Sequence, residues 1–187
     1  LDASGAEVLG KAYGVDRIPT VKGQSMPAYD PRAAQGIGVT YATSTMGADH
    51  TAGYAITANV LAVGGTVDPL KPEGQVELSR DLQRATAAID SSGLCLFVAF
   101  AVLDDQNALD AICEMLGGFY GRPYSADDFI ALGKQVLASE RQFNTAAGFT
   151  AADDRLPDFF KTEKLAPHDV TFTVPDEELD KVHSLSD

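Results

Sequence analysis

Residues 90–95, with the sequence Asp-Ser-Ser-Gly-Leu-Cys, combine a carboxylate, a glycine and a thiol in one short segment. The segment separates a stretch of helical periodicity from the apolar run 94–103, so we expect one helix to end near Asp90 and another to begin near Cys95. A helix N-terminus lowers the pKa of a nearby thiol and favours the thiolate, which is the form that ligates iron in an iron–sulfur cluster. The spacing therefore fits a metal-ligating cysteine that follows a turn, where Gly93 can take a positive φ.

A structural interpretation of the same residues stays open. Gly93 would then simply end a helix, Asp90 would be solvated, and Cys95 would be one of the buried free cysteines that are common in protein cores. The other cysteine, Cys113, follows 18 residues later on an apolar helical stripe, and we expect it in the core. Two cysteines without a Cys-x-x-Cys pair give no disulfide framework and favour a reducing, cytoplasmic setting.

Asp49 and His50 form a second pair that could do chemistry, at the end of a glycine-bounded segment. A histidine titrates near neutral pH and can accept or donate a proton in catalysis. Asp49 is a candidate to orient the ring. The alternative is that His50 is a surface or structural hydrogen-bonding residue.

The segment that leads to this pair contains unusual residues for a helix. Pro27 and Pro31 frame an extended entry, and Pro31 suits the first turn of a following helix. Gly36 and Gly38 lie inside that helix, where each costs about 1 kcal/mol relative to alanine. Two glycines in so short an element indicate that something bulky lies against its backbone.

Helical patterns cover most of the remaining chain. Residues 75–89 are the clearest case, because apolar side chains recur at i, i+4, i+7 and i+11 with polar residues opposite. The run 94–103 is apolar on all sides, which favours a buried helix. Ser125 begins a capping box that opens a long helix. The other expected segments are helices at 3–13 and 107–119, and either a tightly packed helix or extended chain at 52–63.

The composition changes after residue 162. Residues 170–174 alternate strictly between apolar and polar side chains and predict a short edge strand. Residues 175–183 predict a charged short helix or a fraying tail. His168 and His183 lie in this polar C-terminal part of the chain, and we expect both to be solvated. The whole pattern predicts an all-α fold, with an irregular multi-helix domain at 1–160 and a short extended, loosely attached C-terminal arm at 161–187.

Several of these segments, in this order and spacing, resemble the C-terminal part of the tungsten-containing aldehyde:ferredoxin oxidoreductases. The resemblance covers nearly the whole chain. The motifs that carry it are 27–32 (Pro-Ala-Tyr-Asp-Pro-Arg), 36–38 (Gly-Ile-Gly), 41–44 (Tyr-Ala-Thr-Ser), 47–50 (Gly-Ala-Asp-His), 90–95 (Asp-Ser-Ser-Gly-Leu-Cys), 141–144 (Arg-Gln-Phe-Asn) and 153–157 (Asp-Asp-Arg-Leu-Pro).

The resemblance implies that Cys95 is the fourth cysteine ligand of a [4Fe-4S] cluster. It also implies that Asp90 and Leu94 contact one pterin of a tungsten (or molybdenum) bis-pterin dithiolene, with Gly93 as the turn that permits this. His50 would lie beside the metal as a proton donor or acceptor. The family's other three cluster cysteines and its partner glutamate lie upstream and are not in this chain. We therefore expect the isolated chain to lack both cofactors and to be inactive.

The activity implied by the resemblance is oxidation of a small aldehyde to a carboxylic acid, with electrons passed through the cluster to ferredoxin. The implied partners are ferredoxin and the missing N-terminal domains of the same enzyme, with a homodimer as one option. A formal net charge of −13 argues against nucleic acid as a partner. The longest apolar run is about half of what a bilayer requires, so no membrane is expected. The alternative function is that of a non-catalytic helical scaffold or interaction module related to the family.

Overall fold

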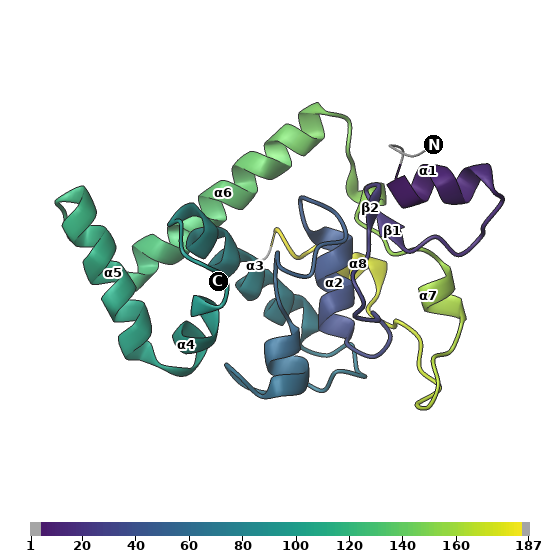
Figure 1. Ribbon diagram of the computed structural model, residues 1–187, viewed down its shortest axis with the longest axis horizontal. Coiled ribbons are helices and arrows are strands. Elements are labelled where there is room, and N and C mark those ends of the chain that lie inside the picture. Colours follow the sequence, from purple (N-terminus) through teal and green to yellow (C-terminus); the bar gives the residue numbers. More distant parts are fainter. Residues whose placement is uncertain (1–4, 185–187) are drawn as a thin grey trace.

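The computed structural model describes residues 5–184, which form helices and one small hairpin (Figure 1). In this view α4, α5 and the start of α6 form one end of an elongated molecule, and the hairpin, α1 and α7 form the other. The elements are α1 (Gly5–Ala12), β1 (Thr20–Val21), β2 (Gln24–Ser25), α2 (Gln35–Thr43), the π-helix η1 (Thr57–Leu61), α3 (Gln75–Ser91), α4 (Val98–Asp104), α5 (Gln106–Tyr120), α6 (Ala126–Ala146), the 3-10 helix η2 (Ala151–Asp153), α7 (Phe159–Thr162) and α8 (Asp176–Leu179). The predicted all-α, irregular multi-helix fold is confirmed.

Helix α2 lies inside the first hydrophobic core. All nine of its residues are buried, and its polar side chains, Gln35, Thr40 and Thr43, form hydrogen bonds inside the molecule. Side chains from the hairpin, α3 and the C-terminal segment belong to the same core, among them Val21, Leu82 and Phe172. A Cβ on Gly38 would lie 2.5 Å from Cε2 of Phe172. The bulky neighbour predicted from the glycines is therefore present, and at Gly38 it is a ring of the chain itself.

The C-terminal segment is part of this core, so the expectation of a loosely attached arm is wrong. Phe172, Val174, Leu179 and Val182 are each at most 3% exposed. Burial of these four side chains anchors the segment, since each contributes on the order of 1.5–3 kcal/mol. Within it, α8 confirms the helical alternative for residues 175–183.

The strand expected at 170–174 does not form in the described chain. An isolated bridge joins Leu165 to Val170, and no ladder continues from it. The backbone N–H groups further along are engaged elsewhere: Phe172 donates to the Phe160 carbonyl at 2.8 Å, and Thr173 donates to Gln35 Oε1 at 2.9 Å. The alternating side chains therefore pack against helices instead of lying in a sheet.

A second hydrophobic core joins α3, α5 and α6. Its buried members include Ile89, Cys113 and Phe129, which confirms the core position expected for Cys113. The capping box at the start of α6 is also confirmed, because Ser125 Oγ accepts from the Asp128 N–H and the Asp128 carboxylate accepts from the Ser125 N–H.

The prediction of a buried helix at 94–103 is wrong in two respects. Helix α4 begins only at Val98, and each of its residues keeps at least partial exposure. The preceding Phe97 is 75% exposed. The reason lies in the position of α4 at one end of the molecule. Val98 and Val102 pack on the second core and Leu103 packs on the first, while Ala101 and Asp104 stay exposed.

Two boundaries also differ from expectation. Helix α2 begins at Gln35 and not at Pro31, because a turn precedes it in which Asp30 Oδ1 accepts from the Arg32 N–H at 2.8 Å. Residues 52–63 contain turns followed by η1, a π-helix that ends where Ala62 takes a φ of +56°. Neither of the two alternatives for this segment is therefore fully correct.

Candidate functional site

The segment 90–95 forms the end of α3 and the connection to α4. Gly93 has a φ of +73°, as the sequence predicts. The Gly93 N–H donates to the Asp90 carbonyl and the Leu94 N–H donates to the Ile89 carbonyl, while Leu94 packs on the core that contains Ile89. These two hydrogen bonds and the apolar contact make a Schellman motif, which needs a left-handed residue at this position.

This turn presents Cys95 to solvent as a free thiol. The backbone carbonyl of Cys95 accepts a hydrogen bond from Val98 at 2.9 Å, so the residue lies one turn before the start of α4. The alternative in which Cys95 is a buried core cysteine is therefore wrong, whereas the alternative role of Gly93 as a helix end is confirmed. The two roles of Gly93 are compatible, because the same turn that ends α3 also exposes the thiol.

Asp90 lines a cavity of about 300 Å³ together with Asp49 and Glu140. Partial burial raises the pKa of Asp90, and the carboxylates of Asp49 and Glu140 raise it further. Gln83 also lines this cavity, and its buried Oε1 has no hydrogen-bond partner among residues 5–184. The structure thus brings the segment around His50 and the end of α3 to one hollow.

His50 lies among aromatic rings. Its ring centroid is 5.6 Å from that of Tyr29 and 5.8 Å from that of Tyr54. The hydroxyl oxygens of the two tyrosines are 2.5 Å apart. Burial and this hydrogen bond raise the pKa of Tyr54 to about 12. The Tyr54 hydroxyl therefore stays protonated near neutral pH, and its hydrogen bond with Tyr29 holds the two rings beside the imidazole.

Asp49 contacts His50 without forming a hydrogen bond to it. Oδ1 of Asp49 is 3.7 Å from Nδ1 of His50, whereas the carboxylate accepts from the N–H and the hydroxyl of Thr51 at 3.0 and 2.7 Å. Nδ1 of His50 is buried and has no hydrogen-bond partner in the described part of the chain. Asp49 thus lies beside this nitrogen but does not fix the orientation of the ring by a hydrogen bond.

An aromatic contact that the sequence analysis missed joins the two candidate segments. Tyr54 lies next to His50, and its ring is 6.2 Å from that of Phe100 on α4. Phe100 in turn stacks on Phe97, two residues after Cys95, at 5.9 Å. No pattern in the sequence could reveal this contact, because it depends on how α4 lies against the segment 47–54. A hollow shared by the His50 ring and the Cys95 thiol themselves stays a prediction.

The prediction that His183 is solvated is wrong, whereas His168 is exposed as expected. Nε2 of His183 is 2.8 Å from the carbonyl oxygen of Thr43, to which it must donate. Burial lowers the pKa of His183 to about 4. The apolar spacing of Leu179 and Val182 was the available signal, because it indicates a buried face just before the histidine.

Comparison with known proteins identifies the family of this chain. Residues 2–184 match the family described as aldehyde ferredoxin oxidoreductase, domains 2 & 3. The chain belongs to this family. It is similar to the tungsten-containing aldehyde ferredoxin oxidoreductases of Pyrococcus furiosus (34% identity over 87% of this chain) and Pyrococcus horikoshii (34% identity over 88% of this chain). The chain spans about a quarter of the length of these relatives, since the match covers 27% of each.

The residues present fit a cofactor that is held jointly with other parts of a protein. Cys95 offers one accessible thiol, and no group of three or more His, Cys, Asp or Glu within residues 5–184 could hold a metal ion. A cluster at Cys95 would therefore need ligands from elsewhere. Over the same residues, no helix is long and apolar enough to cross a membrane.

Proposed function

We propose that this chain forms part of the active site of a tungsten (or molybdenum) pterin oxidoreductase that oxidises an aldehyde to a carboxylic acid. Family membership supports this proposal, together with one observation that carries it. The Schellman turn at Gly93 exposes the thiol of Cys95 five residues after Asp90, whose carboxylate lines a cavity. A turn that served packing alone would not need to present a thiol to solvent.

Three residues of this segment have separate roles in the proposal. Cys95 would be one ligand of a [4Fe-4S] cluster, and Asp90 and Leu94 would contact the pterin of the tungsten (or molybdenum) cofactor. When bound, these groups would supply the two-electron oxidation and carry the electrons to ferredoxin. In the net reaction, an aldehyde and water give a carboxylic acid, two electrons and two protons.

His50 would accept one of these protons. Its Nδ1 has no hydrogen-bond partner in the described chain, and a proton on this atom would lie 3.7 Å from the Asp49 carboxylate. Tyr29 and Tyr54 would keep the imidazole in place on both sides.

The isolated chain would be inactive in this proposal, because one thiol cannot hold a four-iron cluster. The remaining domains of the same enzyme, a small aldehyde and ferredoxin are its partners, in the cytoplasm, where thiols stay reduced.

The test compares two cysteine variants of the full-length protein. Cys95→Ser should lower the iron content and abolish aldehyde-dependent reduction of ferredoxin, because it removes a cluster ligand. Cys113→Ser is the matched control: its thiol is buried in the second core, so the variant should keep its iron and its activity. Unchanged iron content and activity in Cys95→Ser would overturn the role proposed for Cys95. Absence of iron and of aldehyde oxidation in the wild-type full-length protein would favour the non-catalytic scaffold.

A further inference from the structure

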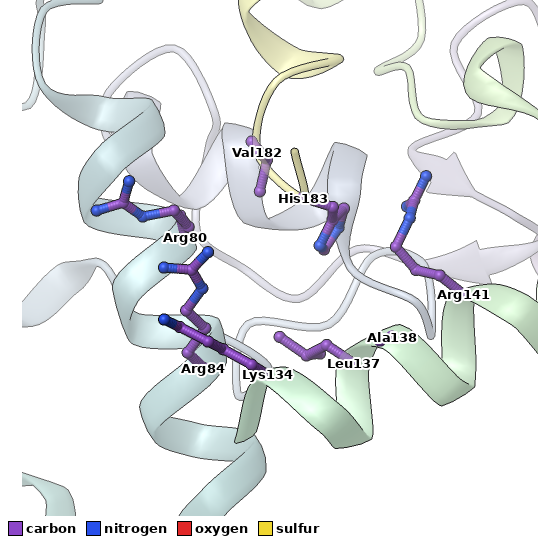
Figure 2. A pocket seen from close by; sticks show the side chains of 8 residues that line it. All are labelled: Arg80, Arg84, Lys134, Leu137, Ala138, Arg141, Val182 and His183. Carbon is purple, nitrogen blue, oxygen red and sulfur yellow. The ribbon is translucent and has the colours of Figure 1, made fainter. Parts of the chain in front are cut away.

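A cationic cavity lies between α3, α6 and the residues that follow α8 (Figure 2). Its volume is about 250 Å³. The lining residues are Arg80, Arg84, Lys134, Leu137, Ala138, Arg141, Val182 and His183. Of these described residues, four are basic and none is acidic, in a chain that has 14 basic and 27 acidic residues overall. The cavity therefore departs strongly from the charge of the whole molecule.

The spacing of the basic residues explains how they converge. Arg80 and Arg84 are four residues apart on α3, so they share one face of the helix. Lys134 and Arg141 are seven residues apart on α6, which also places them on one face. Figure 2 shows Arg80 and Arg84 extending from α3 and Lys134 extending from α6, all three lining the cavity. The packing of α3 on α6 thus creates a concentration of charge that neither helix has alone.

Acidic partners of these residues lie outside the lining. Asp81 approaches Arg80 at 2.7 Å and Arg84 at 3.8 Å, but its side chain is 58% exposed. Asp154 is shared between Arg141 and Lys22. Arg80, Arg84 and Lys134 also take part in further interactions. An anion in the cavity would therefore join or compete with groups that are already engaged.

His183 also lines this cavity, as an uncharged side chain. It donates from Nε2 to the Thr43 carbonyl, and burial lowers its pKa to about 4, with the positive charges of Arg141 and Lys22 acting in the same direction. The ring is uncharged near neutral pH. The positive field in the cavity thus comes from the three guanidinium groups and the lysine.

We propose that this cavity binds a compact, multiply charged oxyanion of the phosphate class. Guanidinium groups donate pairs of hydrogen bonds that match the geometry of phosphate oxygens, and a lysine adds a point charge. The volume lies below the range typical of drug-sized ligands, which favours a small anion or the terminal phosphate of a larger molecule. The proposal is independent of the proposed redox function.

The test is equilibrium dialysis of the full-length protein with radiolabelled inorganic phosphate at constant ionic strength. We expect saturable binding that chloride at the same ionic strength does not displace. Lys134→Gln and Arg80→Gln should each weaken binding by about tenfold or more, since a hydrogen bond to a charged group contributes about 1.5–3 kcal/mol. Lys134→Arg should retain binding, because it keeps the charge.

Arg17→Gln is the control, since it removes one positive charge from an exposed side chain elsewhere and should leave binding unchanged. Circular dichroism of each variant checks that it is folded. Competition by an alkyl phosphate monoester distinguishes the two sources: stronger competition than by unlabelled phosphate identifies a phosphate ester as the ligand, and weaker competition identifies the free anion. Absence of saturable binding, or equal binding in Lys134→Gln, Lys134→Arg and wild type, would overturn the proposal.

Discussion

The buried Nδ1 of His50, which has no hydrogen-bond partner among residues 5–184, is the most informative single atom of the candidate site. A buried nitrogen without a partner destabilises the fold. The Asp49 carboxylate lies near this nitrogen, and the rings of Tyr29 and Tyr54 flank the imidazole. A role in proton transfer accounts for the unpartnered nitrogen and for the carboxylate close to it. A purely structural histidine would be expected to have hydrogen-bond partners for both ring nitrogens.

Replacement of this histidine should therefore affect the reaction more than the fold. His50→Gln in the full-length protein should lower kcat about 10²- to 10⁴-fold, the range for loss of a general acid or base, with little change in KM. Steady-state kinetics with metal analysis measure this. His168→Gln, at an exposed position, is the matched control. A kcat within twofold of wild type would argue for a structural role.

His183 makes a prediction about pH and stability. Its pKa is about 4 in the folded chain, against about 6.5 in an unfolded one. Between these values the unfolded chain binds the proton and the folded chain does not, so stability falls as the pH falls from 6.5 to 4. The shift corresponds to a loss of up to about 3 kcal/mol.

The measurement is urea unfolding at pH 7, 5.5 and 4.5. His183→Gln should have a flatter dependence of unfolding free energy on pH than wild type, because this titrating group is gone. His168→Gln should keep the wild-type dependence. Parallel curves for wild type and His183→Gln would show that the ring is accessible to protons in the folded chain.

At the scale of elements, the contact of α3 with α6 places both the cationic cavity and the cavity lined by Asp90. The close approach depends on Gly133: a Cβ there would lie 1.9 Å from the carbonyl oxygen of Arg84. This is backbone and cannot move aside as a side chain can. The two helices therefore touch at this position only because the residue has no side chain.

Gly133→Ala should destabilise the chain by about 1–3 kcal/mol or more, although alanine favours a helix by about 1 kcal/mol. Gly118→Ala is the matched control within α5, where a Cβ would meet open space among the described residues. This control should stabilise the chain by up to about 1 kcal/mol. Thermal and urea unfolding measure the stability of both variants. Equal changes in unfolding free energy would mean that α3 and α6 can move apart without destabilising the chain.

At the scale of the whole molecule, the N-terminal hairpin is fastened to the C-terminal part by a buried ion pair. Lys22 lies in the turn between β1 and β2 with a φ of +50°. Its Nζ is 2.6 Å from Asp154 and donates to the Ala42 carbonyl at 2.8 Å. Burial lowers the pKa of Lys22, although Asp154 opposes this shift. One side chain thus joins the hairpin, α2 and the region after α6.

Lys22→Met should destabilise the chain by about 3–5 kcal/mol, because it leaves the buried Asp154 without this partner, although its ion pair with Arg141 remains. The double variant Lys22→Met with Asp154→Leu should recover part of this loss, since it removes the buried negative charge. Urea unfolding of wild type, both single variants and the double variant measures the coupling. Simple additivity of the two single effects would indicate that the pair contributes no coupling.

The sequence by itself determined the features that depend on neighbouring residues. The capping box at Ser125, the left-handed turn at Gly93 and the amphipathic α3 follow from local spacing, and the motif order was sufficient for the family. Only the tertiary structure decided which apolar runs are buried. Helix α2 is covered on all sides and α4 is not, although both are mainly apolar in sequence and neither is amphipathic enough to show which side is buried.

For the candidate site, too, local sequence predicted the residue types, whereas contacts between distant segments could not be predicted. The types and order of His50, Asp90 and Cys95 were visible in the sequence, but the contact of Tyr54 with Phe100 and the burial of His183 were not. Periodicity reports which residues share a face of one element. Contacts between residues far apart in the chain, including those that gather four basic side chains in one cavity, arise only when the elements pack.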